Sequence, residues 1–256
     1  DDSKLRNTLP GQPVNALRNT ITYDDNGNMV SATSPAVTYG WDAADRLISI
    51  TKGANLTEFV YDGLSRRVAE KLNGAVIKRW LLDGTEMAEE RDMTGTTVAR
   101  RFFAQGEQIN GINYYFTRDH LGSVREMTDS SGMLVARYDY DPYGRRTRLF
   151  GSLDADFGFT GHYYHATSGL YLAMYRAYNA EIGRWLSRDP LSKMNLNSVN
   201  FKMLDFKDNK IFKNQFNLYD YAKNSPLHFI DVTGLYESVP SGQVPIDTYE
   251  NANPYL

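Results

Sequence analysis

Short runs of apolar and β-branched residues with polar neighbours recur along the first 150 residues. Arg46–Ile50 and Glu58–Tyr61 are two of them, and each is typical of a strand that buries one face. Turn-forming residues separate the runs. Aspartates at positions 24, 42, 62 and 83 mark these turns at intervals of 18, 20 and 21 residues. The pattern therefore predicts stacked β-hairpins with a period of about 20 residues, because one hairpin cannot bury its apolar face alone.

Each repeat has an aromatic residue, an aspartate, a small or turn-forming pair and then a basic or amide residue. The copies begin at Tyr23, Trp41, Tyr61 and Tyr140, and a weaker copy centres on Asp119. An aspartate side chain accepts hydrogen bonds from backbone N–H groups that follow it, and glycine supplies a positive φ. We expect the arginines that follow to pair with these aspartates, and the tyrosine rings to pack on the sheet with their hydroxyls satisfied at its edge.

The periodicity ends near Phe150, and the sequence predicts an all-β fold with only short helices after that point. Residues 170–178 fit a helix or a strand. Asn217 is positioned to cap a short helix through Lys223. Residues 193–214 are rich in lysine and asparagine and are interpreted as a surface insertion. We therefore expect an N-terminal extension (1–19), a repeat region (20–150), a core region (151–235) and an extended C-terminal tail (236–256).

Composition excludes several classes of function. The chain has 28 basic and 31 acidic residues and a net charge of -3, which argues against a nucleic-acid partner. It has no cysteine, and its longest purely apolar run, Leu170–Tyr175, is far too short to span a membrane. His162 and His165 have a spacing that suits a metal, but no third ligand is evident, so we expect hydrogen-bonded structural histidines, no metal and no cofactor.

The repeats resemble the YD repeats of Rhs proteins, of tripartite insecticidal toxin complexes and of teneurins. The second half resembles the Rhs-associated core domain that closes the bacterial members. The motifs that carry this resemblance cover about residues 20 to 235 and lie at 119–125, 138–144, 159–162, 169–171, 183–191, 217–221, 224–227 and 231–235.

This resemblance implies a β-strand spiral that forms a shell around a C-terminal cargo, usually a polymorphic toxin. It further implies an aspartic peptidase that cuts its own chain once. Carried over by motif, the two carboxylates are Asp189 and Asp231, and the cut falls between Leu235 and Tyr236. Two close carboxylates share one proton, so one can activate water while the other polarises the carbonyl. Arg188 would hold one carboxylate ionised, and Gly234 would let the backbone approach the pair.

Three features depart from the family pattern: Ser192 and Val232 replace the usual glycine and proline, and the 193–214 insertion separates the motifs. The sequence therefore leaves open a non-enzymatic alternative, a structural, filament or cell-surface module with a degenerate cleavage motif. A weaker third hypothesis is a glycan-binding adhesin. The expected partners are the chain's own C-terminal segment or a toxin cargo, and the rest of a longer shell or further copies. The resemblance implies a secreted or cell-surface location.

Overall fold

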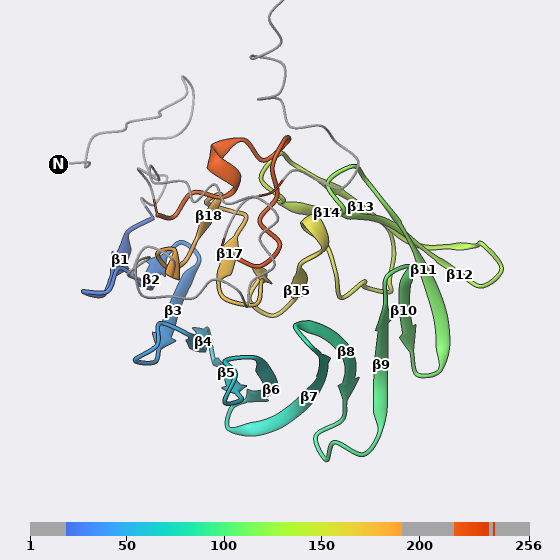
Figure 1. The fold of residues 1–256 in the computed structure, drawn as a ribbon, viewed down its shortest axis with the longest axis horizontal. Helices are drawn as coiled ribbons and strands as arrows, with labels where there is room; N and C mark the ends of the chain where they lie inside the picture. The colour runs from blue at the N-terminus through green and yellow to red at the C-terminus, as the bar shows by residue number, and fades with distance from the viewer. Residues whose placement is uncertain (1–18, 191–217, 236–237, 239–256) are drawn as a thin grey trace, which may run out of the picture.

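The computed structural model describes residues 19–190, 218–235 and 238. The chain first forms a 14-stranded antiparallel sheet in which every strand pairs with the next one along the sequence. Figure 1 shows this sheet as an arc that curls around the elements that follow it. Its strands are β1 (Ile21–Tyr23), β2 (Met29–Thr33), β3 (Ala36–Trp41), β4 (Leu47–Lys52), β5 (Asn55–Tyr61), β6 (Arg67–Leu72), β7 (Ala75–Asp83), β8 (Glu86–Arg91), β9 (Val98–Phe103), β10 (Gly106–Ile109), β11 (Ile112–Arg118), β12 (Val124–Asp129), β13 (Leu134–Tyr140) and β14 (Arg146–Gly151).

A second, four-stranded sheet follows, and we call it the core sheet. It consists of β15 (Tyr163–His165), β16 (Leu170–Leu172), β17 (Ala177–Asn179) and β18 (Arg184–Trp185). The described part of the chain has two one-turn 3-10 helices, η1 (Phe159–Gly161) and η4 (Ala222–Asn224). The all-β prediction is thus confirmed, and the ambiguous stretch after Gly169 forms strands. None of the helices in the described residues is long and apolar enough to cross a membrane.

The aspartate of each repeat builds its turn as expected. Asp62 Oδ1 accepts hydrogen bonds from the backbone N–H groups of Leu64 and Arg66, both at 2.9 Å. The Arg66 guanidinium then lies 2.7 Å from Asp62 Oδ2. It also donates to the carbonyl of Gly84, at the next turn along the same edge of the sheet. The repeat arginine therefore closes its own turn and links that turn to its neighbour.

The aromatic residues of three repeats link neighbouring strands in a similar way. The hydroxyl of Tyr61 donates to the carbonyl of Leu47 at 2.8 Å, and the hydroxyl of Tyr140 donates to that of Val124 at 2.9 Å. The indole N–H of Trp41 donates to the carbonyl of Met29 at 2.8 Å. Each ring thus packs on the sheet while its polar atom caps the preceding strand. This use of the rings favours sheet packing over a glycan platform.

Replacing Tyr61 with phenylalanine tests this link. The variant keeps the ring but leaves the half-buried carbonyl of Leu47 without its donor, so we expect the free energy of unfolding to fall by about 1 kcal/mol. Urea unfolding measures it. The control is Tyr115→Phe, because Tyr115 is 45% exposed. Equal effects in the two variants would contradict the proposed link.

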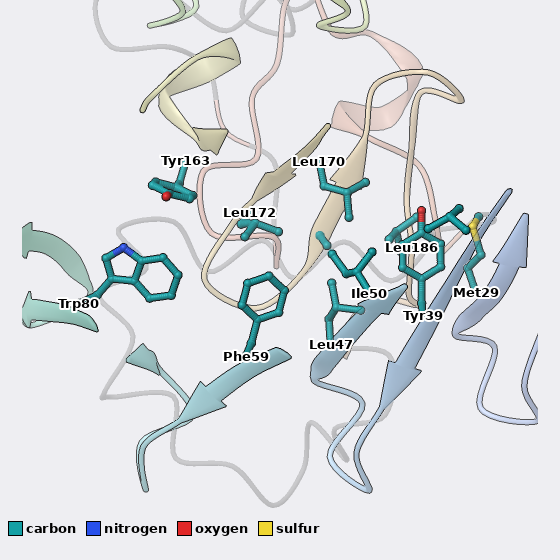
Figure 2. Packing of buried hydrophobic residues seen from close by; sticks show 12 residues of the cluster. Met29, Tyr39, Leu47, Ile50, Phe59, Trp80, Tyr163, Leu170, Leu172 and Leu186 are labelled. Atoms are coloured by element: carbon teal, nitrogen blue, oxygen red, sulfur yellow. The ribbon is translucent and has the colours of Figure 1, made fainter. Parts of the chain in front are cut away.

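The core sheet packs against the concave face of the 14-stranded sheet. In Figure 2, Phe59 and Trp80 from the first sheet face Leu172 and Tyr163 from the second. The Trp80 and Tyr163 rings meet edge to face, with their centroids 5.7 Å apart. The interior of the curved sheet is thus filled by its own C-terminal continuation.

Two expectations about local structure were wrong. Asn217 lies outside the described residues, and the predicted helix through Lys223 is replaced by the single turn η4. Ala222, Lys223 and Asn224 all have positive φ, which a right-handed helix does not allow. Asp83 does mark a turn, but its side chain does not build the turn; the next aspartate that accepts backbone N–H groups in this way is Asp92.

Most of the predicted N-terminal extension, the predicted insertion and most of the predicted C-terminal tail lie outside the described residues, at positions 1–18, 193–214, 236–237 and 239–256. Asn19 is described, and its side-chain oxygen accepts the backbone N–H groups of Thr33 and Ser34 at 3.0 Å.

Candidate functional site

The structure brings Asp189 and Asp231 together although they belong to different segments. Asp189 follows β18, and its backbone N–H donates to the carbonyl of Leu218. Asp231 follows Ile230, whose backbone pairs with that of Ser238. One guanidinium nitrogen, Arg176 Nη2, lies 2.7 Å from Asp231 Oδ2 and 3.5 Å from Asp189 Oδ2. The two carboxylates therefore share one cation, and all three side chains are buried.

Arg176 is the centre of this site, which we call the Arg176 cluster: Arg176, Asp189 and Asp231. It lies in the loop between β16 and β17. Its guanidinium stacks over the Trp185 ring, 4.4 Å from the ring centroid, and its Nε donates to the carbonyl of Gly234. These contacts hold the guanidinium in one orientation. Within these three side chains, one cation faces two carboxylates, and two carboxylates that lie this close favour holding one proton between them.

Asp231 also organises the segment predicted to be cut. Its Oδ1 accepts hydrogen bonds from the backbone N–H groups of Gly234 at 2.8 Å and of Leu235 at 3.1 Å. Burial raises the pKa of Asp231 to about 6, although Arg176 and these N–H groups act in the opposite direction. Leu235 is itself buried. The carboxyl group thus contacts the residue whose carbonyl would be attacked, and it can hold a proton near neutral pH.

A buried chain of hydrogen bonds runs from the backbone carbonyl of Asp231 through His162 and Thr160 to Tyr221. His162 Nε2 lies 2.9 Å from the carbonyl oxygen of Asp231, and His162 Nδ1 lies 2.7 Å from the hydroxyl of Thr160. That hydroxyl is 2.8 Å from the hydroxyl of Tyr221. Burial lowers the pKa of His162, so the ring is neutral at physiological pH and donates from Nε2. His162 therefore has the structural role that the sequence favoured, as does His165, whose ring lies between Ser168 and Glu70.

Gly234 is needed for the close approach of the two loops. Its φ is +78°, and a Cβ at this position would lie 3.1 Å from both Cβ and the backbone nitrogen of Arg176. Gly53 offers a matched comparison, with a φ of +62° and open space around it.

We expect Gly234→Ala to destabilise the protein by about 1–3 kcal/mol more than Gly53→Ala. Both variants place an alanine in the left-handed region, but only the first pushes against Arg176. Thermal or urea unfolding of the two variants measures the difference. Equal destabilisation would show that the loops do not need this close approach.

The arginine assigned from the sequence is not the one at the carboxylates. Arg188 is exposed, and its Nε lies 3.3 Å from the hydroxyl of Tyr219. Arg176 takes the place expected for it. Val232 is 53% exposed, so this departure from the family pattern points away from the buried cluster. Ser192 and Tyr236 lie outside the described residues.

Arg176 does carry a signal in the sequence that went unused. It is a single charge directly after the longest apolar run of the chain and is followed by Ala177 and Tyr178. A charged residue inside such a stretch is buried with it and therefore needs a partner of opposite charge.

Comparisons with known proteins agree with this architecture. Residues 99–227 match the family model Teneurin YD-shell, and residues 23–57 match RHS Repeat. The chain is 29% identical over 227 residues to the tRNA3(Ser)-specific nuclease WapA of Bacillus spizizenii, which covers 84% of the chain and 9% of that protein. It is 24% identical to the double-stranded DNA deaminase toxin A of Burkholderia cenocepacia, over 91% of the chain and 18% of the toxin.

Solved structures show the same fold. The crystal structure of TcdB2-TccC3-TEV superimposes with a TM-score of 0.57 at 21% identity, over 83% of this chain and 11% of that one. The Tc holotoxin pore of Photorhabdus luminescens gives a TM-score of 0.53 at 18% identity, over 89% of this chain and 13% of that one. In all four comparisons the chain spans less than a fifth of the relative's length.

Consecutive hairpins that curl around an internal core sheet define a β shell of repeated aromatic–aspartate units. The chain belongs to the Rhs/YD-repeat family, whose members include polymorphic toxins.

Proposed function

We propose that this chain is the C-terminal part of a cargo-enclosing YD-repeat shell and that it cuts its own backbone once, between Leu235 and Tyr236. The observation that carries the proposal is the Arg176 cluster. Two aspartates from separate segments meet on one buried guanidinium, and one of them is bonded to the backbone of the residue before the cut.

The chemistry follows from a pair that shares one proton. The ionised carboxylate accepts a proton from water as the water oxygen attacks the carbonyl carbon of Leu235, and the protonated carboxyl donates to the carbonyl oxygen. The C–N bond to Tyr236 then breaks, and the leaving nitrogen takes a proton from the pair. The products are a carboxyl group on Leu235 and an amino group on Tyr236. Water is the only co-reactant.

The same contacts support a second candidate, a purely structural cluster. Asp231 Oδ1 accepts two backbone N–H groups, and Oδ2 pairs with Arg176, so these oxygens already have the partners that a buried carboxylate needs. In that case the chain would be a non-enzymatic shell or cell-surface module with a degenerate motif. The two candidates differ only in whether the backbone is cut.

The proposed partners are the chain's own C-terminal segment or a toxin cargo, and the rest of a longer shell. The support is the concave sheet, the family, and the small fraction of each relative that this chain covers. In the described residues β1 and β14 each pair with one neighbour only, and open edges favour pairing with further strands. We propose a secreted or cell-surface location because relatives are toxins or, in Aedes aegypti, a salivary gland surface protein.

Mass spectrometry of the freshly purified chain under denaturing conditions tests the cut. Denaturation is required because the backbone pair between Ile230 and Ser238 lies on both sides of the proposed cut and would keep the tail attached. Two fragments that join at Leu235 and Tyr236 are expected. A single intact mass of 29.1 kDa would favour the structural candidate.

A further inference from the structure

A second group of acids lies between the concave face of the 14-stranded sheet and the core sheet. Three of them, Glu70, Glu90 and Glu107, are buried and come from β6, β8 and β10. The fourth, Asp156, comes from the segment that joins β14 to the core sheet; its side chain is 15% exposed, but its Oδ2 atom is buried. The Glu107 side chain is 0% exposed. None of the four belongs to the Arg176 cluster. They gather where the shell meets its own continuation.

The fixed cations around these acids are too few to balance them. Arg100 Nη1 lies 3.0 Å from Asp156 Oδ2 and 3.7 Å from Glu107 Oε1. Lys78 Nζ lies 3.4 Å from Glu90 and 3.7 Å from Glu70. Among the described residues, three further charged or titratable groups face these four acids. They are Tyr163 and His165 on β15 and Arg67 on β6.

Glu107 and Asp156 are the pair with the fewest donors. Among the described residues, no side-chain N–H or O–H group makes a well-aligned hydrogen bond to either oxygen of Glu107 or to Oδ2 of Asp156. The groups that face these oxygens are the guanidinium of Arg100 and the backbone N–H of Asp156 itself. Yet both carboxyl groups approach the same nitrogen, Arg100 Nη1, and this brings them within hydrogen-bonding reach of each other. Two carboxylates cannot donate to one another, so the contact is a hydrogen bond only if one of them carries a proton.

We propose that Glu107 and Asp156 share a proton at neutral pH and form a pH-sensitive latch that joins the core sheet to the inner face of the shell. The proton supplies the donor that the geometry lacks and offsets part of the excess negative charge. Its loss leaves two buried carboxylates in contact around one guanidinium, and their repulsion loosens this junction.

The contacts around Asp156 connect the latch to the core sheet. The backbone N–H of Tyr164, in β15, donates to the carbonyl of Asp156 at 2.7 Å. The ring of the next residue, Phe157, packs edge to face on Phe102 of β9, with centroids 5.2 Å apart. A displacement of Asp156 away from β10 therefore strains both the entry to β15 and an aromatic contact with the shell.

The direction of the pH effect follows from burial. Burial raises the pKa of Glu107 and of Asp156 above the ordinary range for carboxyl groups. The folded chain then holds more protons than the unfolded chain above about pH 4, so this pair's contribution to stability falls as the pH rises from there towards the raised pKa. The latch is tightest in mild acid.

The test is Glu107→Gln in the full chain, followed by urea unfolding at pH 5.5, 7 and 8.5. Glutamine is an isostere of the protonated acid and donates an N–H to Asp156 without titrating. Wild type should lose stability relative to the variant as the pH rises, by up to tenfold in the unfolding equilibrium constant per pH unit for each excess proton. At pH 8.5 the variant should be the more stable protein. The control Glu86→Gln alters an exposed glutamate of β8 and should follow wild type.

Hydrogen exchange locates the effect. The Tyr164 amide should lose protection between pH 6 and 8.5 in wild type but not in Glu107→Gln, while the amides of β3 should lose none in either. Parallel stability curves for wild type and Glu107→Gln would overturn the proposal. Should the variant fail to fold, infrared spectroscopy of Asp231→Asn decides, because this change removes the other carboxyl group that can hold a proton near neutral pH. A carboxylic acid band that persists at pH 7 in Asp231→Asn supports the shared proton, and its absence overturns it.

Discussion

Replacing Arg176 with methionine is expected to lower the free energy of unfolding at pH 7.5 by about 3–5 kcal/mol, because the change leaves Asp189 and Asp231 buried without their shared cation. Methionine fills similar space over the Trp185 ring, so the loss is mainly electrostatic. The loss should shrink towards pH 4.5, because the raised pKa of Asp231 lets this carboxyl group take up a proton there, and it then no longer needs the cation. Urea unfolding at the two pH values measures both effects.

Arg188→Met is the matched control. Arg188 is exposed and bonds to Tyr219, so its replacement should change the stability by no more than about 0.5 kcal/mol, with no dependence on pH. If the two arginine variants were equally stable, Arg176 would not be the residue that holds the carboxylates.

The second large effect concerns the backbone cut. Asp189→Asn and Asp231→Asn should each slow the cleavage between Leu235 and Tyr236 by about a thousandfold or more, and the double variant should be no slower, because either change disables the same pair. All three variants should fold. Asparagine keeps the size of aspartate, and its side-chain oxygen at position 231 still accepts the N–H groups of Gly234 and Leu235. Denaturing mass spectrometry over time gives the rates.

Asp139→Asn controls for the loss of one negative charge. Asp139 is exposed on β13 and pairs with Arg125, which is not part of the cluster, so this variant should cleave like wild type. If wild type and all variants were uncut, the Arg176 cluster would be structural. If all of them were cut, another protease or the acid-labile Asp141–Pro142 bond would be responsible, and the fragment masses would distinguish these causes.

The repeat region was predictable from the sequence because its chemistry is local. In a unit such as Tyr61–Arg66, the aspartate, the turn and the arginine lie within six residues, so the hydrogen bonds and the ion pair that form the turn join near neighbours in the sequence. The same holds for the carboxylates of the cluster, which lie in short, recognisable motifs. Their common partner was missed because Arg176 meets them only after β16, β17 and β18 have paired.

Two further features could not be predicted from local patterns, one because the pattern was misleading and one because there was no pattern. Asn217 and Lys223 bound a segment that fits a capped helix, but Tyr221 instead packs on Tyr178, with ring centroids 4.4 Å apart, and the backbone turns left-handed to allow it. Glu107 and Asp156 carry no motif at all. Their contact depends on how the joining segment crosses the inner face of the shell, which no short-range pattern encodes.

Cell-free synthesis of the chain in water labelled with oxygen-18, followed by denaturing mass spectrometry, tests the central claim most directly. We expect a fragment that ends at Leu235 and carries one labelled oxygen in its terminal carboxyl group. The fragment that begins at Tyr236 should carry label only in the carboxyl group of its own last residue, where hydrolysis from the transfer RNA adds one oxygen from water to every finished chain. An intact chain, a cut at another bond, or a Leu235 terminus without the label would contradict it.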